Sequence, residues 1–259
     1  MQDWEGRAAP EPQQPPPPRR PAGPSMLPPV ILTLLIVNGA MFLAQGVIGQ
    51  WLLANFALWP LGAPDAMMTR MGLEEVPSFQ VWQLLTYGFL HGGTLHIAVN
   101  MFALWMFGVA LENLWGSRRF AFYFLFCVIG AGLIQLVVAT NAAADGSVYP
   151  TVGASGGVFG ILLGFGMMFP NQRIMLLIPP IPMKAKYFVV AYGAFELWAG
   201  VTGSLSGIAH FAHLGGMVFG LLLILYWRKT GSFIKRRPGP FCRGRSRKNA
   251  GGPEGPPYA

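Results

Sequence analysis

The chain has 259 residues, of which 53% are hydrophobic and 11% charged, and its mean hydropathy is +0.46. A soluble domain carries about 25% charged residues, so the composition indicates a membrane protein. The net charge of +8 would suit nucleic-acid binding if it covered a globular surface, but it is concentrated in tails and short loops. That pattern is typical of membrane topology and predicts no nucleic-acid partner. The two cysteines lie in an apolar segment and a basic tail, so no disulfide framework is expected.

Both ends of the chain are predicted to be disordered. Residues 1–28 are rich in proline and cannot bury a core, and residues 228–259 are rich in Arg, Lys, Gly and Pro. The remaining residues, 29–227, form one predicted membrane domain. We expect no cleavable signal peptide, because the lead is proline-rich and no A-x-A site follows the first apolar residues.

Six apolar segments are predicted in the membrane domain, by the criterion of roughly 17–25 residues per crossing. They cover residues 29–47, 93–114, 119–140, 155–169, 185–202 and 208–227. The fourth is short for a full crossing and follows a polar loop. The long mixed segment 48–92 carries three tryptophans, which fit an interfacial element in the headgroup region. The predicted fold is an all-α membrane bundle of six transmembrane helices.

The distribution of basic residues predicts the orientation of the chain. Nearly all Lys and Arg fall in the two tails and in the junctions that follow the second and fourth segments. If all six segments cross the membrane, these residues share one side, and the other side holds Arg70 with four acidic residues. The positive-inside rule then places both termini in the cytoplasm. Because this requires an even number of crossings, charge supports the six-span model independently of hydropathy.

Polar side chains occur within three of the predicted spans, where their cost indicates function. His96 and Asn100 lie four residues apart on one face of the second span. Ser155, flanked by glycines, opens the fourth span, and His210 and His213 open the sixth. All lie toward the non-cytoplasmic ends in the predicted orientation. We therefore expect them to meet in one shallow, water-accessible cavity.

Small residues predict which of these spans pack together. They recur every four residues, as Gly156, Gly160 and Gly164 on the fourth span and as Ala212, Gly216 and Gly220 on the sixth. Such ridges allow close approach of two helix backbones. Packing of the fourth span on the sixth would bring His213 toward Ser155.

This juxtaposition predicts acyl-transfer chemistry. A hydroxyl beside an imidazole is the minimal activated nucleophile, because the imidazole accepts the serine proton and returns it to the leaving amine. The first N–H groups of a helix that begins at Ser155 have no intrahelical partner and point at an incoming oxyanion. His96 and Asn100 would donate further hydrogen bonds to it. At this stage either His210 or His213 can serve as the base.

Taken together, the motifs resemble those of the rhomboid family of intramembrane serine proteases, over residues 29–227. The family's G-x-S-G-x-x-x-G pattern matches Gly153, Ser155, Gly156 and Gly160. Its A-H-x-x-G-x-x-x-G pattern matches Ala212, His213, Gly216 and Gly220. Its H-x-x-x-N pattern matches His96 and Asn100. One pair departs from the pattern: many bacterial members have Trp-Arg where this chain has Trp82-Gln83.

The resemblance implies a rhomboid-like bundle whose short, central fourth helix carries the serine. It implies a Ser155–His213 dyad with no third acid, which selects His213 over His210 as base. It also implies an oxyanion hole built from the Ser155 N–H, His96 and Asn100, and an aromatic residue, Phe159, stacked under His213. The loop and helix around residues 183–209 are implied to form a mobile gate and cap.

The resemblance further implies which partners the chain has and where it acts. The substrates would be single-pass membrane proteins, cut near the outer end of a helix that unwinds easily, with the lipid bilayer as the surrounding medium. No cofactor and no metal are implied. The lack of a targeting peptide and the minimal six-span layout favour the inner membrane of a bacterium.

Alternative functions remain open. A non-catalytic rhomboid-like protein that binds or escorts membrane helices would need neither the serine nor the histidine. The four histidines would also suit a metal transporter, but neither an H-E-x-x-H spacing nor a nearby carboxylate supports that hypothesis. The G-x-S-x-G elbow of soluble hydrolases requires a preceding strand and a soluble sheet, which this composition does not provide.

We interpret several other polar residues as structural, with no part in catalysis. His91 and His210 are interpreted as braced against loop backbone, and Glu196 as internally hydrogen-bonded with no catalytic role. Glu112, with Arg118 and Arg119, is interpreted as a cluster at the cytoplasmic end of a helix.

Overall fold

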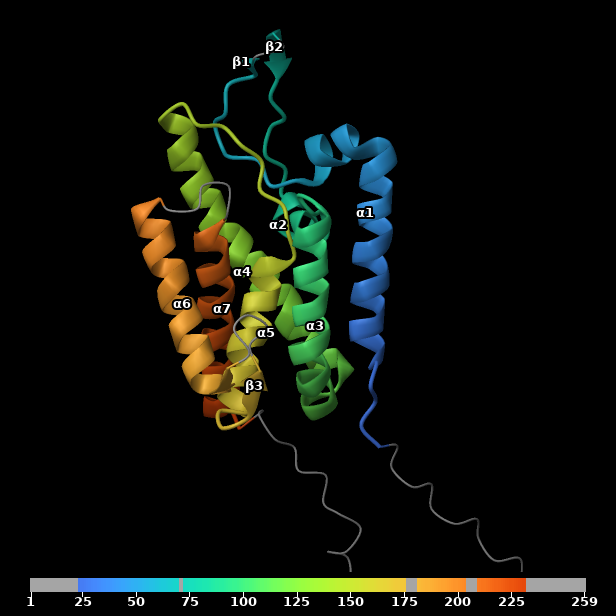
Figure 1. The fold of residues 1–259 in the computed structure, drawn as a ribbon. Helices are drawn as coiled ribbons and strands as arrows, with labels where there is room; N and C mark the ends of the chain where they lie inside the picture. The colour runs from blue at the N-terminus through green and yellow to red at the C-terminus, as the bar shows by residue number, and fades with distance from the viewer. Residues whose placement is uncertain (1–22, 70–71, 176–180, 204–208, 232–259) are drawn as a thin grey trace, which may run out of the picture.

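The computed structural model describes residues 23–69, 72–175, 181–203 and 209–231. Within these ranges the chain is mostly helical, and its long helices run side by side (Figure 1). Their bounds are α1 Pro29–Phe56, α3 Thr94–Trp115, α4 Ser117–Ala144, α5 Ser155–Met168, α6 Ala185–Thr202 and α7 His210–Lys229. The tails that we expect to be disordered lie outside the described residues, except for 23–28 and 228–231.

Four of the described helices, α1, α3, α4 and α7, are long and apolar enough to cross a membrane. Helix α5 is apolar but has only 14 residues, and α6, with 18 residues, is not among the four. The chain is therefore a multi-pass helical membrane protein, as its composition predicts. The first residue of α1 and the last residue of α7 lie at the same, lower end of the bundle (Figure 1).

Helix α1 starts at a proline and ends well beyond its predicted span. Pro29 suits the first turn because its missing N–H would have no intrahelical partner there. Non-helical backbone angles at Ile48 (φ −123°, ψ 31°) kink the helix one residue beyond the predicted end of the segment, and the helix then continues to Phe56. The hydrophobicity pattern thus located the straight part of α1 and missed its bent continuation.

Glu112 anchors the start of α1 to the end of α3. Its carboxylate accepts hydrogen bonds from the N–H groups of Val30 (3.0 Å) and Ile31 (2.9 Å) and from the Ser117 hydroxyl (2.6 Å). A negative charge at a helix N-terminus also interacts favourably with the helix dipole. Glu112 lies in the last turn of α3, at the helix end where the sequence places it, and its buried carboxylate caps the start of α1.

The segment between α1 and α3 consists of four short elements. They are β1 Ala66–Thr69, β2 Gly72–Glu75, α2 Gln83–Thr86 and the 3₁₀ turn η1 Tyr87–Phe89. The β1–β2 hairpin projects from the upper end of the bundle (Figure 1). The Trp82-Gln83 pair is well hydrogen-bonded, because the Trp82 indole N–H donates to the Asn55 carbonyl (3.0 Å) and the Gln83 Oε1 accepts from the Trp59 N–H (3.2 Å).

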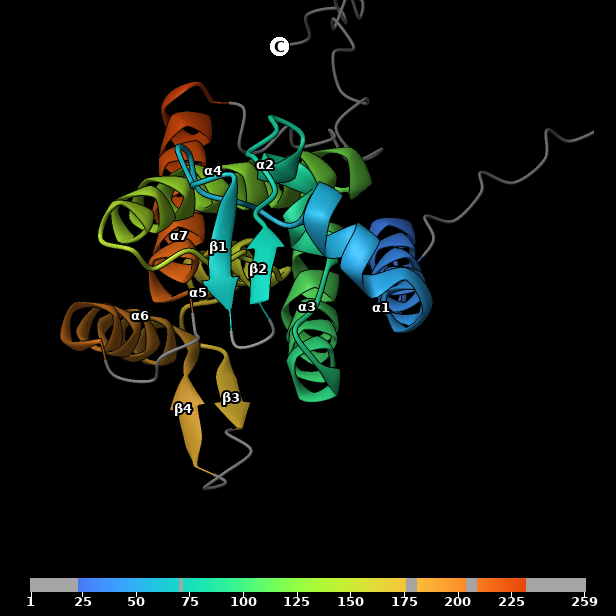
Figure 2. The same cartoon turned by 90° about the horizontal axis from the view of Figure 1, so that it is seen from above.

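Helix α5 lies between α3 on one side and α6 and α7 on the other (Figure 2). Its glycines meet those of α7 as the small-residue ridges predict: a Cβ on Gly216 would overlap the Gly156 carbonyl oxygen. A Cβ on Gly160 would lie 3.1 Å from the Gly216 carbonyl oxygen and would overlap the Cys127 sulfur of α4. The two backbones are therefore in contact at these glycines, and this crossing fixes the start of α5 against α7.

Candidate active site

Ser155 is the first residue of α5, and the backbone before it is held from two sides. Thr151 and Leu58 exchange backbone hydrogen bonds (2.9 and 3.0 Å), which join this segment to the loop after α1. The Gly153 N–H donates to the Tyr87 carbonyl (2.9 Å). Gly153 has a φ of +136°, and a Cβ there would lie 2.8 Å from His96 Cε1. Only glycine meets both constraints, so Gly153 is required for the turn that presents the serine hydroxyl.

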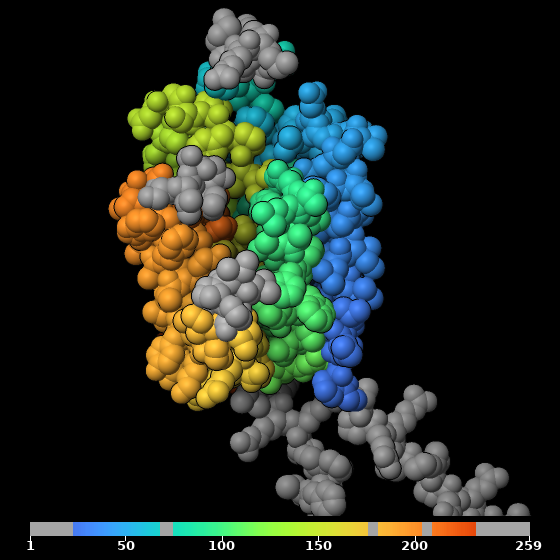
Figure 3. All heavy atoms as spheres, in the orientation of Figure 1, coloured from blue at the N-terminus to red at the C-terminus, as the bar shows by residue number. Residues whose placement is uncertain are grey.

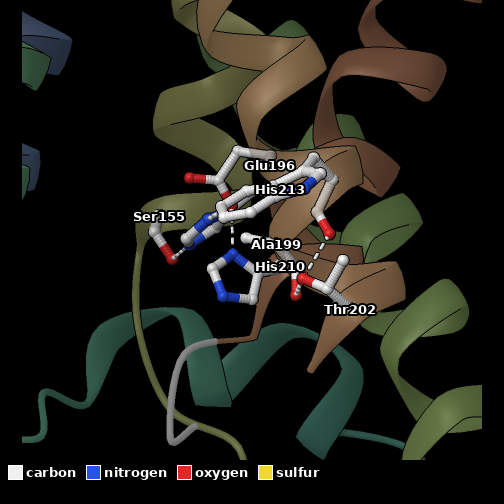
Figure 4. A network of polar contacts seen from close by, with 7 residues as sticks. Ser155, Glu196, Ala199, Thr202, His210 and His213 are labelled. Carbon is white, nitrogen blue, oxygen red and sulfur yellow. Dashed lines mark hydrogen bonds and ion pairs between the residues drawn. The ribbon is translucent and has the colours of Figure 1, made fainter. Parts of the chain in front are cut away.

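His213, on the first turn of α7, faces this hydroxyl. Its Nε2 lies 2.8 Å from Ser155 Oγ (Figure 4). The ring stacks on Phe159, one turn beyond the serine, with a centroid distance of 4.2 Å and an interplanar angle of 5°. The structure therefore brings together the serine and the histidine named by the sequence patterns, with the aromatic ring in the position that the resemblance implies.

Glu196 of α6 lies on the opposite side of the same imidazole. Its Oε2 is 2.8 Å from His213 Nδ1 and 2.7 Å from His210 Nδ1. A carboxylate only accepts hydrogen bonds, so both Nδ1 atoms carry protons. The proton on His213 Nδ1 leaves its Nε2 lone pair free to accept the serine O–H. Ser155, His213 and Glu196 thus form one line of hydrogen bonds (Figure 4).

Three expectations are corrected by this contact. The implied absence of a third acid is wrong in this chain, since a carboxylate reaches the free nitrogen of His213. Glu196 is internally hydrogen-bonded, but to the site itself, and His210 is braced by this carboxylate and not by loop backbone. The statement that no carboxylate lies near the histidines is also wrong. Glu196, His210 and His213 each offer one ligand atom, and these atoms lie within 4.8 Å of one another, so that they could hold a metal ion.

A single signal in the sequence could have revealed this partnership. A carboxylate within an apolar segment needs a buried partner, and two histidines follow Glu196 at 14 and 17 residues. The spacing alone does not show which of the four histidines faces it.

His96 and Asn100 of α3 face the serine from the other wall. The Gly92 N–H donates to His96 Nδ1 (3.1 Å), so in neutral His96 the ring proton is on Nε2. That nitrogen lies beside Gly153, where an added Cβ would be 2.9 Å away. Asn100 is buried and donates one side-chain N–H to the His96 carbonyl (2.9 Å). Both side chains line the same cavity as Ser155.

His91 lies just before α3 and supports His96. The two rings meet edge to face, with a centroid distance of 5.3 Å. Burial, together with the neighbouring His96, lowers the pKa of His91 to about 4. Its backbone is held by the Gln45 amide, which accepts from the His91 N–H (2.9 Å) and donates to its carbonyl (3.0 Å). The bracing thus comes from a side chain of α1 as well as from the backbone at Phe89.

One large cavity contains these groups. It has a volume of about 1380 Å³ and is lined by His96, Asn100, Ser155 and His213. Apolar side chains of α3 and α6 extend it away from the serine, among them Phe102, Met106 and Phe188. Figure 3 shows this face of the molecule hollowed between α3 and α6. A polar end and an apolar extension suit a long ligand with one reactive group.

The apolar helices define a multi-pass helical membrane protein, and the serine–imidazole pair is its candidate site. The family model for the rhomboid domain matches residues 78–230. The chain is 34% identical over 180 residues to Rhomboid protein 1, mitochondrial, of Saccharomyces cerevisiae. The aligned residues cover 68% of this chain and 51% of that protein. The chain belongs to the rhomboid family, which confirms the resemblance seen in the motifs.

Two further relatives come from a plant and a bacterium. RHOMBOID-like protein 4 of Arabidopsis thaliana is 31% identical over 201 residues, which cover 74% of this chain and 48% of that protein. Rhomboid protease GluP of Bacillus subtilis is 32% identical over 157 residues, which cover 60% of this chain and 28% of that protein. The chain thus spans about half the length, or less, of these relatives.

Proposed function

We propose that the protein is an intramembrane serine endopeptidase, with Ser155 as nucleophile and His213 as general base. The observation that carries this proposal is the 2.8 Å contact between Ser155 Oγ and His213 Nε2 inside a family that includes a named protease. A non-catalytic protein that binds or escorts membrane helices would not need a serine whose proton is poised for transfer.

The proposed reaction follows from the tautomer of His213. As Ser155 Oγ attacks the peptide carbonyl, its proton passes to Nε2, and the carbonyl oxygen becomes an oxyanion. The Ser155 N–H, His96 Nε2–H and the second side-chain N–H of Asn100 donate hydrogen bonds to it. The imidazolium then protonates the leaving amine, and water repeats the sequence to release the acyl group from the serine. Removal of one oxyanion donor typically lowers turnover by about 10²–10³-fold.

The proposed substrates are transmembrane segments of single-pass membrane proteins. The apolar extension of the cavity, between α3 and α6, supports entry from the lipid bilayer. A peptide bond inside a helix is shielded by the surrounding turns, so the substrate must unwind before the serine can reach its carbonyl. Segments with weak helix formers near their outer ends should therefore be preferred.

The proposed topology has six crossings, with a short central helix, α5, that carries Ser155. Residues 1–28 and 228–259 would be cytoplasmic tails on either side of the 29–227 membrane domain, and the membrane would be the inner membrane of a bacterium. Basic residues at the lower end of the bundle support this orientation, at the start of α4 and at the end of α7 (Figure 1). By this orientation the serine lies toward the outer face.

Cleavage of a reporter by purified protein tests the proposal. The wild type, Ser155→Ala and His213→Ala are reconstituted in liposomes with a single-pass reporter, and the products are followed on gels. Both variants should lose cleavage, and Ser155→Ala should keep the melting temperature of the wild type. Ser147→Ala, which alters an exposed loop serine, is the matched control and should cleave normally. Full cleavage by Ser155→Ala would overturn the proposal.

A further inference from the structure

We propose that Glu196 is a positioning residue for His213, and that His210 holds Glu196 in place. The proposal rests on the proposed function, because it concerns how His213 is kept ready to accept the serine proton. It replaces the expected pair of residues with a line of four: Ser155, His213, Glu196 and His210.

The first step is the choice of tautomer. A neutral imidazole carries its proton on either nitrogen, and only the Nδ1–H form can accept from Ser155 through Nε2. The Nε2–H form would instead donate to the serine oxygen and could not act as base. Glu196 Oε2, 2.8 Å from Nδ1, accepts only and so favours the productive form. Its negative charge also favours the imidazolium that forms when the serine proton is transferred.

The second step concerns why the carboxylate stays in position. Glu196 is 3% exposed, and a buried charge is costly unless hydrogen bonds compensate it. His210, one turn before His213 on α7, supplies a second N–H to the same oxygen at 2.7 Å. The two imidazole rings stand nearly perpendicular, with an interplanar angle of 85°. The two rings approach Oε2 in different planes, so both N–H groups can donate to the same oxygen.

The third step is that, among the described residues, the His210 side chain has no hydrogen bond other than the one to Glu196. Its Nε2 is buried without a hydrogen-bond partner among the described residues. Its contact with Glu196 is thus the hydrogen bond that the structure gives this side chain. By sharing Oε2, His210 both fixes the carboxylate and reduces the negative charge available to His213.

Two further titratable side chains, Tyr192 and His96, interact electrostatically with Glu196 and His213. Tyr192 of α6 lies near enough to Glu196 for their charges to interact, and His96 of α3 does the same with His213. Both remain unchanged in the variants described below. A change in pH dependence can therefore be assigned to the position that is substituted.

Kinetics across pH test the positioning role. Cleavage of a fluorogenic transmembrane peptide is measured from pH 5 to 9 in the presence of a chelator, because the same atoms could hold a metal ion. Glu196→Gln keeps the side-chain volume and removes the charge. When the orienting acid of a serine–histidine–aspartate triad is neutralised, kcat falls by up to about 10⁴-fold. We expect a fall of at least about 10²-fold here, with KM within about threefold of the wild type.

The pH profile separates positioning from mere support of the fold. Without the carboxylate charge, the acid limb of the kcat profile should move to lower pH. His210→Phe keeps a ring and removes the second donor, so the limb should move in the opposite direction, with a smaller loss of kcat. His210→Asn keeps an N–H donor and should restore the wild-type profile.

The controls distinguish failure of this inference from failure of the proposed function. Glu112→Gln removes the charge of another buried carboxylate and should leave both kcat and the pH profile unchanged. A Glu196→Gln enzyme with kcat within about threefold of the wild type would overturn the positioning role, as would a loss of kcat with an unmoved acid limb. Ser155→Ala is assayed in parallel, since cleavage by that variant would overturn the proposed function itself.

Discussion

Two glutamates are buried in this molecule to nearly the same degree, and they differ in what they touch. Glu112 is 2% exposed and Glu196 is 3% exposed. Glu112 accepts from two backbone N–H groups and one hydroxyl at the start of α1. Glu196 accepts from two imidazoles, one of which contacts Ser155. Burial therefore does not distinguish the two carboxylates, whereas the titratable imidazoles beside Glu196 do.

The largest effect on stability should come from the crossing of α5 and α7, which brings His213 to Ser155. In Gly216→Ala the new Cβ would overlap the Gly156 carbonyl oxygen, so α7 must move away from α5. Overpacking of this kind costs about 1–3 kcal/mol, and the shift should also separate His213 from Ser155. We expect a lower melting temperature in detergent together with a loss of cleavage of more than about tenfold.

The matched control for that variant lies in α1. A Cβ on Gly39 would meet no atom within 4 Å, so Gly39→Ala should keep full activity and should not lower the melting temperature. Equal behaviour of the two alanine variants would show that the α5–α7 contact does not hold the site together.

The next effect concerns Glu112 and tests the comparison from its structural side. Glu112→Gln retains one acceptor oxygen but leaves at least one of three donors without its carboxylate partner, at a cost of about 1–2 kcal/mol. Thermal unfolding should report this loss, while the initial rate of cleavage at 25 °C stays at the wild-type level. A rate that falls as far as in Glu196→Gln would erase the distinction between the two carboxylates.

The last effect is a dependence of stability on pH at His91, just before α3. The folded protein holds the pKa of His91 at about 4, below the ordinary value of 6.5. Between these values the unfolded chain binds more protons, so His91 destabilises the fold as pH falls from 6.5 to 4, by at most about 1.4 kcal/mol per pH unit. His91→Phe should flatten the fall of the melting temperature over this range. An unchanged slope would contradict the assignment.

The sequence predicted most of the helical framework because hydrophobicity and glycine spacing are local signals. The predicted starts of the second and fourth segments, at residues 93 and 155, match Thr94 and Ser155. The kink at Ile48 was missed, since no proline marks it. The β1–β2 and β3–β4 hairpins, the latter from Arg173–Met175 and Pro182–Lys184, have strands of three or four residues, which are too short for a periodic pattern.

The candidate site was predicted less completely, because some of its contacts join residues that lie far apart in the sequence. Spacings of three and four residues indicated Ser155, His213, His96 and Asn100 as site residues, because each spacing lies within one helix. Glu196 meets its partners across the α6–α7 pair, and Glu112 meets Ile31 from 81 residues away. Such contacts depend on how helices rotate against each other, which hydrophobicity in a membrane segment does not specify.

Mapping of a covalent adduct tests the central claim most directly. The reconstituted wild type is treated with a fluorophosphonate, digested and analysed by mass spectrometry, with His213→Ala treated in parallel. We expect an adduct on Ser155 in the wild type and at least about a 10²-fold slower reaction in the variant, because the hydroxyl would lack its base. An adduct on another residue, or equal labelling of Ser155 in both proteins, would contradict it.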